Sequence, residues 1–240
     1  MAIKNVTVGK TQYSLSYELL NHTCEKSILF LHGWGADKEL MKGVFGKFLK
    51  DYRHIYLDLP GFGNSSIKEA LNSFDVKDIV KEFLSSIGKD PQIVVGHSFG
   101  GKIALLLNPE NIVLLSSSGI VLPKRLWVKM KIAFFKIAKF FALKRFYKIF
   151  ASKDVKDMNF TMYEMFKKVV DEDMSEYFRD YKGRAILFWG KDDSATPVIS
   201  ARKINTLIQK STLFELEGDH FFFLNKGGFI EEKIIRNLKD

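Results

Sequence analysis

Cysteine is almost absent from this chain: Cys24 is the only one among 240 residues. A single thiol excludes an intrachain disulfide and is typical of a protein from a reducing compartment. Long uncharged apolar runs are missing too, since the best candidate, residues 132–143, contains Lys136 and Lys139. The first six residues also lack the apolar core of a signal peptide. We therefore expect a cytoplasmic protein with no transmembrane segment.

Acidic residues are missing from one long stretch, residues 124–153. Ten lysines and arginines lie there, while the whole chain carries a formal charge of +9, so the remainder is close to neutral. No DNA- or RNA-binding motif accompanies this charge, and we expect no nucleic-acid partner. The stretch is either a solvated face or a surface for an acidic acyl carrier protein, an anionic substrate or an anionic membrane.

Metal-ligand spacing and phosphate-binding loops are missing as well. The five histidines and the one cysteine do not cluster as the ligands of a metal site do, and the chain has no P-loop. We expect neither a metal nor another cofactor, so any chemistry must come from the side chains themselves.

One short stretch, residues 93–101, carries the strongest chemical signal. It reads I-V-V-G-H-S-F-G-G, which is a β-branched run, a G-x-S-x-G turn around Ser98, and then an apolar, helix-forming segment. Strand, tight turn and helix are the context in which G-x-S-x-G forms a nucleophile elbow. Such a turn strains the backbone of Ser98 and holds its hydroxyl at the carboxyl end of the strand. The N–H of Phe99 would then point toward an oxyanion formed there.

Short apolar strands alternate with helices along most of the chain. After a hairpin around Gly9 and Lys10, the sequence predicts strands at residues 27–31, 54–57, 93–95, 112–115, 185–189 and 212–216. This alternation predicts an α/β fold with a mostly parallel eight-stranded sheet and helices on both faces. Residues 122–181 show only helical patterns, which predicts a helical cap inserted after the sixth strand. Residues 1–121 and 182–240 would form the core.

A serine hydroxyl is a poor nucleophile by itself, so the turn predicts a histidine base and a carboxylate partner. His220 follows the last strand, at the edge of the sheet where Ser98 is expected. The strand before it ends in W-G-K-D-D, which offers both Asp192 and Asp193, and spacing alone does not choose between them. The chain order of serine, acid and histidine is that of the α/β-hydrolase fold.

Five motifs make the chain resemble the α/β-hydrolases over essentially its whole length. They are H-G-W-G from His32, D-L-P-G-F-G-N-S from Asp58, G-H-S-F-G-G from Gly96, W-G-K-D-D from Trp189 and G-D-H from Gly218. The resemblance implies a catalytic triad of Ser98, Asp193 and His220, because the acid of this family sits third after the glycine of W-G. It also implies that the backbone N–H groups of Trp34 and Phe99 form the oxyanion hole.

Two subfamilies share the most with this chain. H-G-W-G and D-L-P-G-F-G resemble the pimeloyl-acyl-carrier-protein methyl ester esterases, in which a basic cap would meet the acidic carrier. The general layout also resembles the meta-cleavage-product hydrolases, which cleave a C–C bond in 2-hydroxy-6-oxo-2,4-dienoates. We expect a carboxylesterase acting on small or medium acyl esters. The alternatives are a C–C bond hydrolase and a non-catalytic ligand-binding or receptor-like protein.

The substrate pocket is the least defined part of the sequence. The cap contains many aromatic and methionine side chains, which favour an apolar roof above the serine. The same side chains could instead only pack the cap onto the core. The residues expected to line the pocket are Trp127, Phe134, Phe141, Met162 and Phe221.

Overall fold

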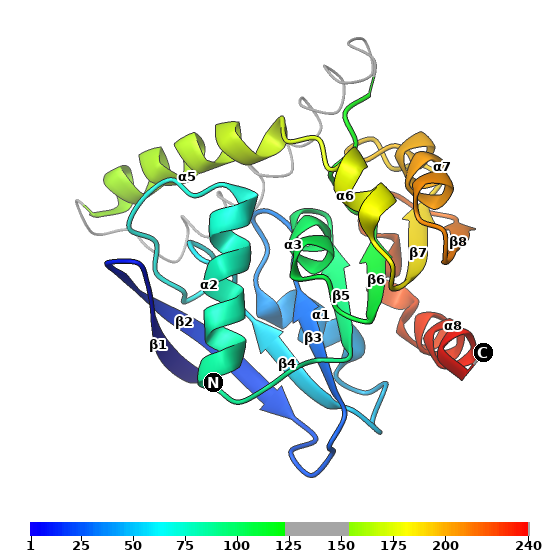
Figure 1. The fold of residues 1–240 in the computed structure, drawn as a ribbon, viewed down its shortest axis with the longest axis horizontal. Coiled ribbons are helices and arrows are strands. Elements are labelled where there is room, and N and C mark those ends of the chain that lie inside the picture. The colour runs from blue at the N-terminus through cyan, green and yellow to red at the C-terminus, as the bar shows by residue number, and fades with distance from the viewer. Residues whose placement is uncertain (123–153, 240) are drawn as a thin grey trace.

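An eight-stranded sheet forms the centre of the molecule (Figure 1). The computed structural model describes residues 1–122 and 154–239. The strands are β1 (Ala2–Val8), β2 (Thr11–Leu20), β3 (Ser27–Leu31), β4 (Arg53–Leu57), β5 (Ile93–His97), β6 (Asn111–Leu115), β7 (Arg184–Gly190) and β8 (Ser211–Leu216). Their order across the sheet is β1-β2-β4-β3-β5-β6-β7-β8.

The sheet is mostly parallel. β1 pairs with β2 and β2 with β4 in the antiparallel sense, and every other neighbouring pair is parallel. The central strands β3 and β5 are buried along their whole length, as expected for strands that helices cover on both faces. The predicted fold class is therefore confirmed.

Helices cover both faces of this sheet, and each face has its own hydrophobic core. One core joins α2 (Ser73–Ser86), α3 (Phe99–Leu107) and α7 (Val198–Leu207) to the sheet. The other joins α1 (Lys38–Phe45), the short 3₁₀ turn η1 (Phe222–Asn225) and α8 (Gly227–Lys239). Because side chains alternate along each strand, successive residues of β5 contribute to opposite cores.

Among the described residues between β6 and β7, two further helices are α5 (Asp154–Val170) and α6 (Ser175–Asp180). The pattern of residues 161–171 predicts a helix there, and the observed helix α5 begins earlier. Its Met165 and Val169 are buried in the same core as α2 and α3. The first part of the expected cap, residues 123–153, lies outside the described residues, so its boundaries at 122 and 181 stay a prediction.

The pattern of residues 39–50 predicts one helix, which is longer than the observed helix by several residues. Helix α1 ends at Phe45, with Gly46 as its C-cap, and Leu49 has a left-handed backbone with φ of 52°. The apolar side chains beyond the end do not continue the helix, because Leu49 N–H donates to Glu231 of α8 and Phe48 packs against Gly227. Hydrophobic periodicity here reflects contact with α8.

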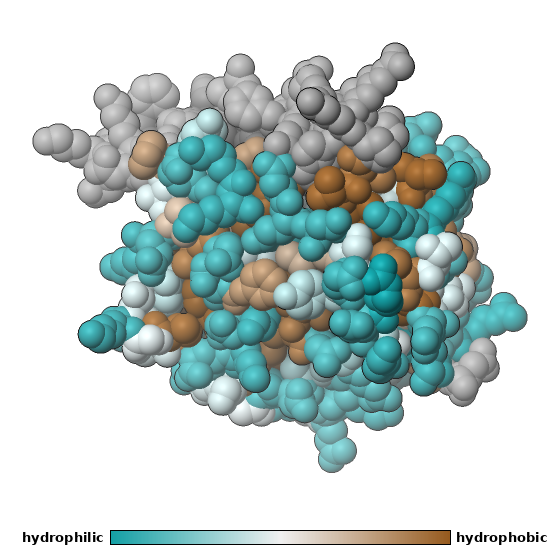
Figure 2. Space-filling view, turned by 45° about the horizontal axis from the view of Figure 1, so that its top comes forward, coloured by the Kyte–Doolittle hydropathy of each residue, from teal (hydrophilic) through white to brown (hydrophobic). Residues whose placement is uncertain are grey.

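The visible surface in Figure 2 is mostly hydrophilic, with smaller hydrophobic areas between the polar residues. The large apolar side chains with the highest exposure lie on separate elements, for example Ile3 on β1 and Phe160 on α5. In the ranges 1–122 and 154–239, no helix combines the length and the apolar character needed to cross a bilayer.

Candidate active site

Ser98 sits on a strained turn between β5 and α3. Its backbone has φ of 53° and ψ of −113°, a region that residues with a Cβ rarely adopt. Strand and helix pass so closely that a Cβ on Gly96 would lie 2.4 Å from the carbonyl oxygen of Gly100. The sequence prediction of a strained serine between two glycines that permit close approach is confirmed.

The main chain of Ser98 is fixed, but its hydroxyl is not engaged. Ser98 N–H donates to the carbonyl of Leu115 at 3.0 Å, and its own carbonyl accepts from the N–H of Ser118 at 3.0 Å. The side chain is buried, and Oγ has no hydrogen-bond partner among the described residues. A buried hydroxyl without a partner is costly, so its presence here favours a functional role.

Asp193 and His220 lie within hydrogen-bonding distance of each other. The Nδ1 of His220 is 2.8 Å from Oδ2 of Asp193, and both side chains are almost fully buried. The other carboxylate oxygen, Oδ1, accepts from the N–H groups of Ala195 and Thr196, each at 2.8 Å. The structure therefore pairs Asp193 with His220, whereas the side chain of Asp192 is exposed.

The Asp193 carboxylate is held in its charged form. Burial alone would raise the pKa of this carboxyl, but the facing imidazole of His220 and the hydrogen bonds that the carboxylate accepts keep its pKa below the ordinary value. A negative charge beside Nδ1 stabilises an imidazolium and fixes which ring nitrogen carries the proton.

Thr196 is a site residue that the sequence reasoning missed. Its hydroxyl lies 2.8 Å from Oδ2 of Asp193, 3.0 Å from the carbonyl of Ser116 and 3.3 Å from Nδ1 of His220. The signal that could have found it is the spacing Asp-x-x-Thr before a helix, where an aspartate often accepts from the backbone N–H groups that follow it. Thr196 joins the acid, the base and the loop after β6.

The loop after β3 carries the other predicted oxyanion donor, Trp34. The buried ring of His32 shapes this loop, with Nδ1 2.8 Å from the carbonyl of Gly33 and Nε2 accepting from Leu59 N–H at 3.0 Å. Burial keeps the pKa of His32 below its ordinary value, so this ring is neutral. Phe99 lies in the first turn of α3, where backbone N–H groups have no partner within the helix.

Aromatic side chains surround the loop that bears Trp34. Its indole packs edge-on against the rings of Phe62, Phe99 and Phe166, with centroids 5.0, 5.7 and 5.2 Å away. Phe166 comes from α5, so this helix contacts the predicted oxyanion loop directly. Neither Phe62 nor Phe166 was among the predicted pocket residues.

Two of the five predicted pocket residues can be placed. The sulfur of Met162, on α5, lies against Gly61 of the loop after β4. The ring of Phe221 has its centroid 5.4 Å from that of His220. The remaining three, Trp127, Phe134 and Phe141, lie outside the described residues. In the ranges that the structure describes, no group of three or more histidine, cysteine, aspartate or glutamate side chains could hold a metal ion.

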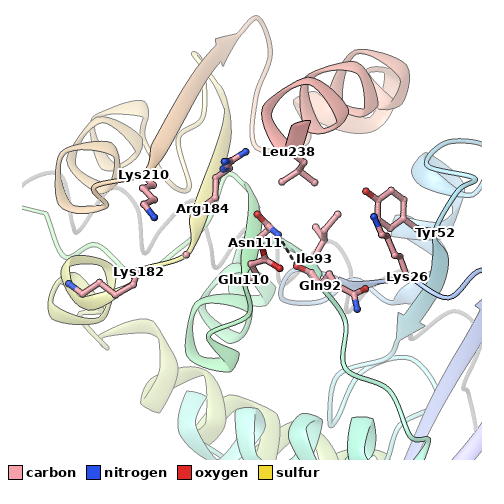
Figure 3. A pocket seen from close by; sticks show the side chains of 11 residues that line it. Lys26, Tyr52, Gln92, Ile93, Glu110, Asn111, Lys182, Arg184, Lys210 and Leu238 are labelled. Carbon is pink, nitrogen blue, oxygen red and sulfur yellow. Dashed lines mark hydrogen bonds between the residues drawn. The ribbon is translucent and has the colours of Figure 1, made fainter. Parts of the chain in front are cut away.

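A pocket of about 360 Å³ lies at the amino ends of the central strands, whereas Ser98 lies at their carboxyl ends (Figure 3). Its lining includes Ile93, Asn111 and Arg184, the first residues of β5, β6 and β7. Ser98 follows the last residue of β5. The length of the sheet therefore separates this pocket from Ser98.

Comparison with known proteins gives a consistent picture of the fold. A family model described as the alpha/beta hydrolase family matches residues 28–231. An esterase from Thermogutta terrifontis superposes with a TM-score of 0.74 at 14% identity, covering 100% of this chain and 98% of the other. A meta-cleavage product hydrolase from Pseudomonas fluorescens superposes with a TM-score of 0.76 at 14% identity, covering 98% and 97%.

Curated sequences match over a shorter range. The 2-succinyl-6-hydroxy-2,4-cyclohexadiene-1-carboxylate synthase of Shigella dysenteriae is 34% identical over 79 residues, which is 33% of this chain. The match spans only 31% of the length of that protein. The proteins of this name from Escherichia coli match over the same length.

Proposed function

Because the chain belongs to the alpha/beta hydrolase family, and is a hydrolase by that membership, we propose that it cleaves carboxylic esters through an acyl-enzyme on Ser98. The observation that carries this proposal is the buried hydrogen bond between Asp193 and His220, at the same sheet edge as the strained Ser98. An acid–base pair and an unengaged hydroxyl are the parts that nucleophilic acyl transfer needs.

The proposed reaction begins when His220 takes the proton of Ser98 Oγ as this oxygen attacks the ester carbonyl. Asp193 stabilises the imidazolium that forms, and the N–H groups of Trp34 and Phe99 hold the oxyanion. Each such donor lowers the barrier by about 3 kcal/mol. The imidazolium then protonates the leaving alcohol, and water activated by His220 releases the acid.

The described surroundings of Ser98 favour an apolar acyl group. The rings of Phe62, Phe99 and Phe166 each pack against Trp34, and Phe99 directly follows Ser98. Small or medium acyl esters suit such a lining better than a charged acyl chain does, because a buried charge without a partner is costly. The basic residues 124–153 would serve a different part of the substrate, such as an acidic carrier.

The direct test is hydrolysis of p-nitrophenyl acetate, butyrate and octanoate by the wild type and by Ser98→Ala. We expect turnover in the wild type and loss of at least about 10³-fold in the variant. Ser86→Ala, at the last residue of α2, is the matched control and should keep full activity, because the Ser86 hydroxyl bonds only to the carbonyl of Phe83 in the contacts described. Equal rates for wild type and Ser98→Ala would refute the esterase and leave the ligand-binding alternative.

Cleavage of a C–C bond is the second candidate. The chain resembles the meta-cleavage-product hydrolases in layout, and it shares 34% identity over 79 residues with a synthase whose named product is a cyclohexadiene carboxylate. Decay of the visible absorbance of a 2-hydroxy-6-oxo-2,4-dienoate, faster than ester hydrolysis, would favour this candidate. An unchanged absorbance would rule out the C–C bond hydrolase.

A carrier partner is the remaining proposal for residues 124–153. If charge drives the contact, the affinity for an acidic acyl carrier protein should fall as sodium chloride is raised, because salt screens exposed charges. Affinity that does not depend on salt, or no binding at all, would contradict a carrier.

A further inference from the structure

His97 is a buried histidine that the proposed reaction does not use. It is the last residue of β5, directly before Ser98, and its side chain is 1% exposed. Because side chains alternate along a strand, it points to the same face as Ile93 and Val95, the face that α1 and α8 cover. The side chain of His97 therefore lies on the face of the sheet opposite to α3.

The ring of His97 contacts the loop that carries the proposed base. Its Nε2 lies 3.1 Å from the carbonyl oxygen of His220, and the centroids of the two imidazoles are 4.7 Å apart. The rings of Phe221 and Phe223 pack against it at 5.2 and 4.7 Å. One side chain thus links the nucleophile strand to the backbone of the base.

The other ring nitrogen of His97 faces the predicted oxyanion loop. A Cβ on Gly33 would lie only 2.7 Å from Nδ1, and this nitrogen has no hydrogen-bond partner among the described residues. Because a carbonyl can only accept, Nε2 must carry the proton and Nδ1 the lone pair. Burial, and then the nearby His220, hold the pKa of His97 well below its ordinary value, so the ring stays in this neutral form.

We propose that His97 is a positioning residue for the Ser98–His220 pair, acting through its hydrogen bond to the His220 main chain. This proposal rests on the proposed function. Asp193 fixes the His220 ring at Nδ1, and His97 fixes the backbone from which that ring extends. With both ends held, the distance from the imidazole to Ser98 is set by the fold rather than by a mobile loop, which preserves reactive geometry.

Three substitutions of His97 distinguish the effect of its hydrogen-bond donor from the effect of its ring. His97→Phe keeps a ring but loses the donor, His97→Gln places an amide N–H at about the reach of Nε2, and His97→Asn places one too close to the backbone. We expect kcat to fall about tenfold in the Phe and Asn variants, as loss of one aligned hydrogen bond implies, with KM nearly unchanged. The Gln variant should recover most of kcat.

The readout that does not depend on turnover is the NMR signal of the proton between His220 and Asp193. It should remain sharp in the wild type and His97→Gln and broaden in His97→Phe, with melting temperatures measured alongside. Wild-type kcat and an unchanged signal in His97→Phe would overturn the proposal, as would a Gln variant as impaired as Phe at equal stability. If His97→Phe does not fold, the Gln and Asn variants decide by the same criteria. Absence of any Ser98-dependent turnover would instead refute the proposed function, while the signal still tests His97.

Discussion

The ammonium group of Lys38 lies 2.8 Å from Oδ2 of Asp58, and both side chains are almost completely buried. The other oxygen of Asp58 accepts from the backbone N–H of Lys38, also at 2.8 Å. This pair ties the start of α1 to the loop after β4, and Leu59 in that loop donates to His32. The predicted oxyanion loop is thus connected to a buried ion pair through His32 and Leu59.

Replacing Lys38 should be costly. Lys38→Met leaves the Asp58 carboxylate buried without its cation, and breaking a buried pair in this way costs about 3–5 kcal/mol of unfolding free energy. Lys42→Met is the matched control, since Lys42 pairs with Glu18 on the surface and should cost less than about 1 kcal/mol. Urea unfolding measures both, and equal costs would contradict the role of the buried pair.

Stability should fall as the pH is lowered below about 6.5. His32, His54 and His97 are buried, and burial lowers the pKa of each below the ordinary value of 6.5. Below that pH the unfolded chain binds protons that the folded chain does not, so unfolding free energy falls by up to about 1.4 kcal/mol per pH unit for each histidine. His54→Gln, at the edge of the sheet away from Ser98, should flatten this slope, and an unchanged slope would contradict the assignment.

The two adjacent acids should differ sharply in kinetics. Asp193→Asn removes the charge beside His220 Nδ1 and should lower kcat about 10⁴-fold, the size of effect seen when a triad acid loses its charge. Asp192→Asn, an exposed neighbour, should change kcat less than twofold. A larger loss of kcat in Asp192→Asn than in Asp193→Asn would show that Asp192, and not Asp193, is the acid.

Adding one methyl group at Gly33 should harm activity more than stability. Its Cβ would lie 2.7 Å from His97 Nδ1 and 3.0 Å from Ser98 Cβ, so the elbow must shift. A shift of about 1 Å at a reacting group costs about 10²-fold in rate. Gly43→Ala is the control, because a Cβ there meets nothing within 4 Å and a helical alanine is favourable. Full activity in Gly33→Ala would show that the elbow tolerates the shift.

The sequence predicts the elbow well because local chemistry determines it. A β-branched run, two glycines around a serine and an apolar helix allow only a narrow set of backbone paths at residues 93–107. Strands β3 to β7 are predicted for the same reason, since each is a short and mostly buried run between turn residues.

Contacts between distant segments are what the sequence could not supply. Asp192 and Asp193 are adjacent aspartates that spacing alone does not distinguish, and Asp193 is the one that turns inward to contact His220, which follows another strand. Lys102 is a second case. Its position on an apolar helix gives no hint that its ammonium lies 3.3 Å from Glu172, beyond the end of α5.

The most direct measurement is intact-protein and peptide mass spectrometry after reaction with a fluorophosphonate. We expect one phosphonyl group per chain, located on Ser98, with much slower labelling in His220→Ala and none in Ser98→Ala. Labelling that is absent from the wild type, lies on another residue, or persists in Ser98→Ala would show that Ser98 is not the activated nucleophile.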